Sequence, residues 1–140
     1  MIKQYVYINQ YDWHVTIIYN ANQDLSAVAE ELWYAECPSY IARHALSKVI
    51  VKKNSGICFT NDKLHTSIIC VTEADSAYEL INTIVHEIKH LQSHICSYYG
   101  ISEKGEEAAY LSGNIVEEFY EVFRYELDKF EKWHCYSNKN

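Results

Sequence analysis

The most informative segment of the chain runs from residue 76 to residue 100 and reads SAYELINTIVHEIKHLQSHICSYYG. It predicts one long helix, because Ser76 with Glu79 three residues on forms a capping box and Gly100 is a natural helix stop. Between these ends lies a broad apolar stripe at helical spacing, which is typical of a helix packed into a core. Its members are Leu80, Ile81, Ile84, Val85, Ile88, Leu91 and Ile95.

The middle of this helix carries the motif His86-Glu87-Ile88-Lys89-His90. Histidines four residues apart share one helix face, with Cβ atoms about 5–6 Å apart. Two imidazole nitrogens can then reach one zinc ion at about 2.0–2.1 Å. Glu87 lies beside this face, where it can take a proton from a metal-bound water without binding the metal itself. The motif predicts zinc on His86 and His90 with Glu87 as general base; a neutral, hydrogen-bonded histidine pair is the alternative.

Two further residues of this helix bear on the class of site. His94 continues the histidine series, but it lies about 12 Å along the helix axis from His86. We therefore expect it at the rim of the site or behind the ligands, and not on the ion. Ser93 and Cys96 stand where a metzincin has glycine and histidine. That departure excludes a metzincin.

The third zinc ligand is expected from the next predicted helix, which opens with Glu106 and Glu107. A glutamate on an antiparallel neighbouring helix completes a His₂Glu catalytic zinc site. Periodicity leaves both glutamates open. The small residues Ala109 and Gly113 lie near the Glu106 edge of the helix, where they would let the two helices approach, so they favour Glu106.

The segments before this helix predict a β-rich first half. Residues 2–8 alternate with period two, residues 13–19 are rich in β-branched and aromatic side chains, and together they predict a hairpin. Asp24 is a good N-cap for a helix reaching about Cys37, and Pro38 precedes a second short helix. Further strands are expected at 49–51, 57–59 and 65–71. Residues 104–133 predict a final helix, apolar around more than half its circumference and hence central, with Glu117, Glu118 and Glu121 on a solvated face.

The combination of His86-Glu87-x-x-His90 with Glu106-x-x-Ala109-Tyr110 resembles the gluzincin-like side of the zincin metallopeptidase superfamily. More closely, residues 77–113 look like small phage- and mobile-element-associated metallopeptidases with a zincin-type core. The resemblance implies zinc on His86, His90 and Glu106, with Glu87 as general base. It also implies that the strand before the active helix, residues 65–71, lines the cleft and pairs with an extended peptide.

Composition excludes several classes of protein. The 140 residues carry a net charge of −7 with only 12 Lys and Arg, so we expect no nucleic-acid partner. No apolar run approaches the roughly 18 residues that span a bilayer, so we expect no membrane association. The first residues lack a signal-peptide pattern. The five cysteines form no Cys-x-x-Cys pair and are expected to be reduced thiols of a cytoplasmic protein.

These observations together predict one α+β, zincin-like domain over residues 1–140, with a small sheet packed on helices. The expected function is zinc-dependent hydrolysis of a peptide bond in a peptide or protein substrate. Tyr110, His94 and His65 are candidates for stabilising the oxyanion. A non-catalytic regulatory module of mobile-element origin with a structural zinc site is the alternative, and a zinc-free interaction domain is a third reading.

Overall fold

Four strands and four helices build the described part of the chain, in agreement with the expected α+β class. The computed structural model describes the backbone of residues 1–137 and the side chains of residues 1–130. Short 3-10 turns precede β2, α1 and β4. In chain order the elements are β1 (Ile2–Ile8), β2 (Trp13–Tyr19), α1 (Leu25–Tyr34), α2 (Ser39–Val51), β3 (Gly56–Asn61), β4 (Thr66–Val71), α3 (Ala77–Tyr99) and α4 (Glu106–Ser137).

The sheet is mixed, with strand order β1-β2-β4-β3. The predicted hairpin is confirmed, because β1 pairs antiparallel with β2. β4 pairs parallel with β2 on one side and antiparallel with β3 on the other. The expectation that the strand at 65–71 would pair with a peptide is therefore wrong, since both of its edges are occupied. β3 is the edge strand on this side of the sheet.

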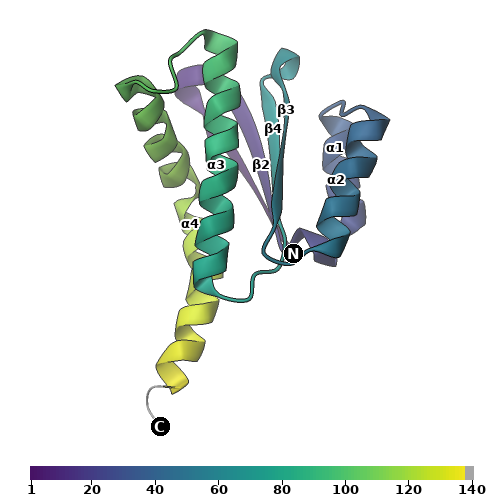
Figure 1. The fold of residues 1–140 in the computed structure, drawn as a ribbon, viewed down its shortest axis with the longest axis vertical. Coiled ribbons are helices and arrows are strands. Elements are labelled where there is room, and N and C mark those ends of the chain that lie inside the picture. The colour runs from purple at the N-terminus through teal and green to yellow at the C-terminus, as the bar shows by residue number, and fades with distance from the viewer. Residues whose placement is uncertain (138–140) are drawn as a thin grey trace.

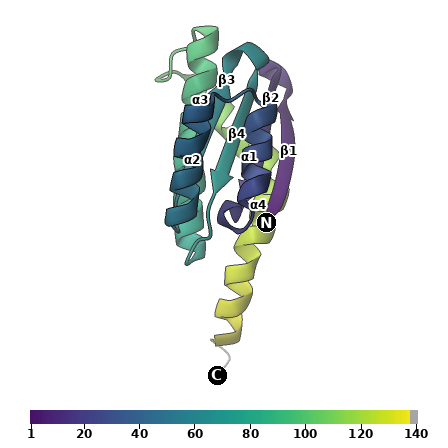
Figure 2. The ribbon, with the colours of Figure 1, turned by 90° about the vertical axis from the view of Figure 1, so that its right-hand side faces the viewer.

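Two helical layers cover the two faces of the sheet. In the edge-on view, α1 and α2 lie on one side of the strands and α3 and α4 on the other (Figure 1). The view turned by 90° shows α1 and α2 side by side in front of the sheet (Figure 2). Each layer has its own core: Ile18, Ile68 and Cys70 face α1 and α2, whereas Ile17 and Ile69 face α3 and α4. Successive residues of a strand thus pack against opposite helical layers.

The predicted starts of α1 and α3 are confirmed by their N-caps. The Asp24 side chain accepts a hydrogen bond from the Ala27 amide, and the Ser76 hydroxyl accepts one from the Glu79 amide. Gly100 ends α3 in the left-handed conformation, with φ of 68°. α1 is shorter than expected, because it ends at Tyr34.

The prediction of a strand at 49–51 is wrong, because α2 continues through Val51. Val49 falls one turn after Ala45, and both are buried against the sheet. Tertiary burial of this i, i+4 pair outweighs the strand preference of three consecutive β-branched residues.

The final helix was expected to be central, and this too is wrong. α4 lies in an outer layer, and its C-terminal part extends past the other elements (Figure 1). Among the described side chains of α4, the buried apolar residues form one stripe: Ala108, Leu111, Ile115 and Phe119. In α3 the apolar stripe is likewise narrower than predicted, because Ile81 and Val85 are exposed.

Candidate functional site

His86 and His90 lie side by side on the exposed face of α3, as their spacing predicts. Their Nε2 atoms are 3.1 Å apart. Two nitrogens that share a tetrahedral zinc ion at about 2.0–2.1 Å would stand about 3.4 Å apart. The pair therefore fits a shared metal ion, and it equally fits a hydrogen bond from one neutral imidazole to the other.

His86 and His90 line a pocket of about 280 Å³ between α2, the edge strand β3 and α3. α3 contributes Glu87 and His94 in addition to the pair. β3 supplies the segment 56–59, and α2 supplies a face at helical spacing. The lining residues of α2 are Ile41, His44, Ala45 and Lys48.

Glu87 points inward from the same turn of α3 and is only 3% exposed. Its Oε2 atom is buried without a hydrogen-bond partner in the part of the chain that the structure describes. Burial raises the pKa of the Glu87 carboxyl, against smaller lowering effects of His86 and Lys48. An unpaired buried carboxylate costs stability, so such a group in a pocket points to function.

Gly56 leaves the space that the Glu87 side chain occupies. A Cβ atom at Gly56 would lie 2.9 Å from Glu87 Cγ and 2.9 Å from the Cys70 carbonyl oxygen. Contacts below 3.0 Å are not tolerated by real side chains, so any larger residue at this position must displace the carboxylate or the strand.

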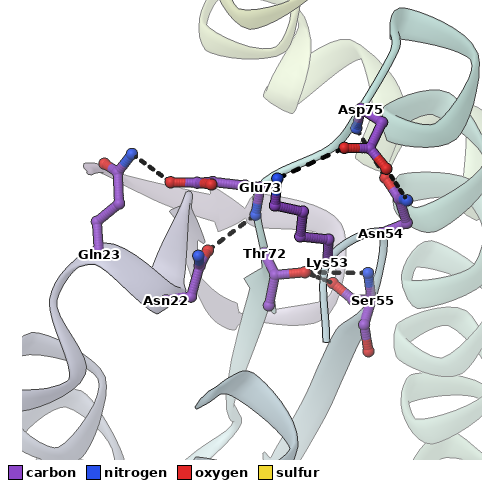
Figure 3. A network of polar contacts seen from close by, with 8 residues as sticks. All are labelled: Asn22, Gln23, Lys53, Asn54, Ser55, Thr72, Glu73 and Asp75. Atoms are coloured by element: carbon purple, nitrogen blue, oxygen red, sulfur yellow. Dashed lines mark hydrogen bonds and ion pairs between the residues drawn. The ribbon is translucent and has the colours of Figure 1, made fainter. Parts of the chain in front are cut away.

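A polar network holds the start of β3 in place (Figure 3). The Asn54 side chain donates to Asp75 Oδ2 at 2.9 Å and accepts from the Asp75 amide at 2.8 Å. The Thr72 hydroxyl donates to the Ser55 carbonyl at 3.0 Å and accepts from the Ser55 amide at 3.0 Å. The network ties the loop before Gly56 to the segment that leads into α3. It therefore fixes Gly56 relative to Glu87.

Glu106 and Glu107 do not join the histidine pair. Both lie exposed at the start of α4, and the Glu107 carboxylate accepts a hydrogen bond from the Tyr11 hydroxyl at 2.9 Å. α4 meets α3 where Gln92 donates to the Ala108 carbonyl at 2.9 Å. Gln92 lies about 240° around the helix from His86, so α4 packs on a different face of α3.

The packing argument that favoured Glu106 is wrong. Ala109 is exposed, and a Cβ at Gly113 would meet nothing within 4 Å. The small residue that does approach α3 is the fully buried Ala108. Across the described residues, no group of three or more His, Cys, Asp and Glu side chains is arranged to hold a metal ion.

Of the three oxyanion candidates, only His94 lines the pocket. Tyr110 is 70% exposed on α4, and His65 stacks on Trp13 with ring centroids 5.1 Å apart. His94 Nδ1 lies 2.7 Å from Thr60 Oγ1. Sequence reasoning could not detect this contact, because Thr60 and His94 meet only in the folded chain.

The cysteines within the described part are free thiols, as expected: Cys37, Cys58, Cys70 and Cys96. Cys135 lies outside the described side chains. Burial raises the pKa of the Cys58 thiol to about 12, so it remains protonated beside the pocket. Among the described helices, none is long and apolar enough to cross a membrane.

Fold and site together define an α+β protein with a mixed sheet between two helical layers and a histidine pair beside a buried carboxylate. No family model, curated protein or solved structure was found to match this chain.

Proposed function

We propose that this protein is a zinc-dependent hydrolase of the zincin type, acting on peptide bonds in the pocket between α2, β3 and α3. The observation that carries the proposal is Glu87. Its carboxylate is buried, and one oxygen has no hydrogen-bond partner among the described residues. Glu87 directly follows His86, whose Nε2 atom lies 3.1 Å from that of His90. Core packing alone does not favour such an arrangement, because a buried unpaired acceptor costs about 1–3 kcal/mol.

His86 and His90 would hold the zinc ion, which when bound supplies a water activated for attack. Glu87 would accept a proton from the attacking water and return it to the amine nitrogen of the leaving group. Its burial suits this role, because burial raises the pKa of the carboxyl toward the working range of a general base.

Two helices, α2 and α4, each offer a candidate for the third ligand. The sequence favours Glu106, whereas the structure puts His44 of α2 in the pocket with the pair. His44 is exposed on the pocket face of α2, and its side chain would turn toward the pair to reach a shared ion, because no third ligand is already in place among the described residues. We therefore favour His44, with Glu106 as the alternative.

The unpaired edge of β3 in the described sheet favours a peptide as the substrate. One side of β3 pairs with β4, and the described strands leave its other side unpaired. An extended peptide can add to such an edge through main-chain hydrogen bonds. Because residues 56–59 also line the pocket, a peptide bound there would pass directly by Glu87.

The alternative, a regulatory module with a structural zinc site, is less well supported. Structural zinc sites are closed by four protein ligands. Here the two histidines are exposed and face an open pocket. A structural site would also have no use for the buried Glu87 carboxylate.

The decisive experiment compares zinc-loaded wild type with Glu87→Gln on a mixture of unstructured peptides, with cleavage followed by mass spectrometry. We expect Glu87→Gln to retain zinc and to lose cleavage by at least about 100-fold. Glu117→Gln, which changes an exposed carboxylate on α4, is the matched control and should behave as wild type. Cleavage by Glu87→Gln at the wild-type rate would refute the general-base role.

A further inference from the structure

A continuous chain of hydrogen bonds runs from the core of the protein to the pocket. The Trp13 indole N–H donates to Ser67 Oγ at 2.9 Å. Ser67 Oγ lies 2.6 Å from Thr60 Oγ1, and Thr60 Oγ1 lies 2.7 Å from His94 Nδ1. The chain thus crosses β2, β4 and β3 before it reaches α3.

The direction of this chain follows from counting donors and acceptors. The indole N–H can only donate, so Ser67 accepts from Trp13 and must give its own hydroxyl hydrogen to another group. Ser67 is fully buried, and Thr60 is its only other partner in the described structure. Ser67 therefore donates to Thr60. The Thr60 hydroxyl keeps its own hydrogen, and His94 Nδ1 at 2.7 Å is its other hydrogen-bond partner in the described structure, so Thr60 donates to His94 Nδ1.

The opposite direction would leave a buried hydrogen without an acceptor. If His94 Nδ1 donated to Thr60 and Thr60 to Ser67, the Ser67 hydroxyl would have no group left to bond. That loss is unfavourable in a site that water does not reach. The second neighbour of His94 Nδ1 is compatible with either direction: Cys58 Sγ lies 3.9 Å away and is a protonated thiol, which can donate or accept.

Nδ1 of His94 is therefore an acceptor, and the neutral ring carries its proton on Nε2. Burial lowers the pKa of His94, so the neutral ring is favoured in the folded protein. A protonated Nε2 has no free lone pair for a metal ion, but it donates a hydrogen bond. In the described structure Nε2 has no protein partner, and the His94 ring lines the pocket.

We propose that His94 is a catalytic hydrogen-bond donor, whose Nε2–H binds the carbonyl oxygen of the substrate and stabilises the oxyanion that develops there. This inference rests on the proposed peptidase function of the same pocket. His94 lies one turn beyond His90, with ring centroids 6.3 Å apart, and on the β3 side where a paired peptide would pass. Thr60 and Ser67 are then positioning residues that act through the His94 tautomer.

The first test needs no activity. Long-range ¹H–¹⁵N NMR correlation of the full chain reports which imidazole nitrogen carries the proton. We expect His94 to be protonated at Nε2, both without metal and with one equivalent of zinc. Thr60→Val, which removes the donor to Nδ1 at nearly constant volume, should abolish this preference. Thr66→Val is the matched control and should leave the preference unchanged, because the hydroxyl of Thr66 donates to the Leu64 carbonyl and lies outside this chain of hydrogen bonds.

The second test measures turnover and zinc content together. His94→Ala should lower kcat on the order of 100-fold, the usual effect of losing one oxyanion donor, and leave zinc content unchanged. His94→Gln, whose amide can donate from a similar position, should recover part of kcat. A proton on Nδ1 of wild type, or loss of zinc in His94→Ala, would overturn the proposal.

The two tests separate this inference from the function on which it rests. If wild type binds zinc but cleaves no peptide, the proposed function fails, and His94 loses its catalytic role even if Nε2 is protonated. If wild type cleaves peptides but His94 is protonated on Nδ1, only the role of His94 fails.

Discussion

The Glu87 carboxylate rests against Gly56, so that a Cβ atom on Gly56 would come within 2.9 Å of Glu87 Cγ and 3.0 Å of its Oε1 atom. This contact joins α3 to the edge strand β3. We expect Gly56→Ala to destabilise the fold by about 1–3 kcal/mol, the usual cost of overpacking, and to displace the carboxylate. Urea unfolding measures the first effect and peptide cleavage the second.

The control for that substitution is Gly113→Ala. Gly113 lies inside α4, and a Cβ there would meet nothing within 4 Å. Alanine should stabilise this exposed helical position by about 0.5–1 kcal/mol. Equal effects of the two substitutions would contradict the close packing of Gly56.

Glu87 should make the protein less stable as pH rises. Burial raises the pKa of its carboxyl above the usual 4.5, so the folded state holds the proton more tightly than the unfolded state. The free energy of unfolding then falls as pH rises from the unfolded pKa through the higher folded pKa. Glu87→Gln removes the charge and should reduce this fall, which leaves an inactive variant more stable than wild type near pH 7.

Urea unfolding from about pH 4 to about pH 8 measures that difference. Glu117→Gln, on the solvated face of α4, should keep the wild-type pH dependence. A Glu87→Gln curve parallel to wild type over the whole range would show that Glu87 does not carry the proposed burial penalty.

Asn54 should contribute to stability through both its side chain and its backbone. It adopts φ of 56°, in the left-handed region, and its side-chain amide makes two hydrogen bonds to Asp75. Asn54→Ala loses the bonds and strains the backbone, so we expect a loss of about 2–3 kcal/mol in urea unfolding. Asn54→Gly loses the bonds without the strain and should cost about 1 kcal/mol less.

The exposed Asn82 of α3 supplies the control for this pair, because Asn82→Ala should leave stability unchanged or slightly raised. Indistinguishable values for Asn54→Ala and Asn54→Gly would mean that the left-handed backbone costs alanine nothing there.

Local signals in the sequence were sufficient for much of the fold. The caps Asp24 and Ser76, the stop at Gly100 and the alternation over residues 2–8 depend on neighbours along the chain, and each was predicted correctly. The helical state of residues 49–51 was not, because it depends on burial of Val49 against a sheet that no local pattern describes. Strand order is equally non-local, so β3 could not be recognised as the edge strand.

The candidate site likewise has features that follow from local sequence and features that depend on tertiary contacts. The facing of His86 and His90 follows from helix geometry alone, and the sequence predicted it. The side of α3 on which α4 packs depends on tertiary contacts such as that of Gln92 with Ala108. The sequence therefore had no means of placing Glu106 relative to the pair. For the same reason the bond from Thr60 to His94 could not be foreseen.

Zinc binding should depend on the histidine pair. Protein purified without chelator is expected to hold about one zinc ion per chain, and His86→Ala or His90→Ala should weaken zinc binding by at least about 100-fold in competition titrations. His14→Ala is the control, because His14 is an exposed histidine of β2 whose ring contacts Tyr7. Zinc retained by both variants of the pair would contradict the proposed site.

The same titration decides the third ligand. Because His44 lines the pocket and Glu106 does not, we expect His44→Ala to weaken zinc binding by at least about tenfold and Glu106→Ala to leave it within about twofold of wild type. The reverse result would require the start of α4 to move around α3 when zinc binds. That movement would break the hydrogen bond from Gln92 to the Ala108 carbonyl, so amide hydrogen exchange in the first turns of α4 would then change on addition of zinc. With His44 as the ligand, exchange should change in α2 instead.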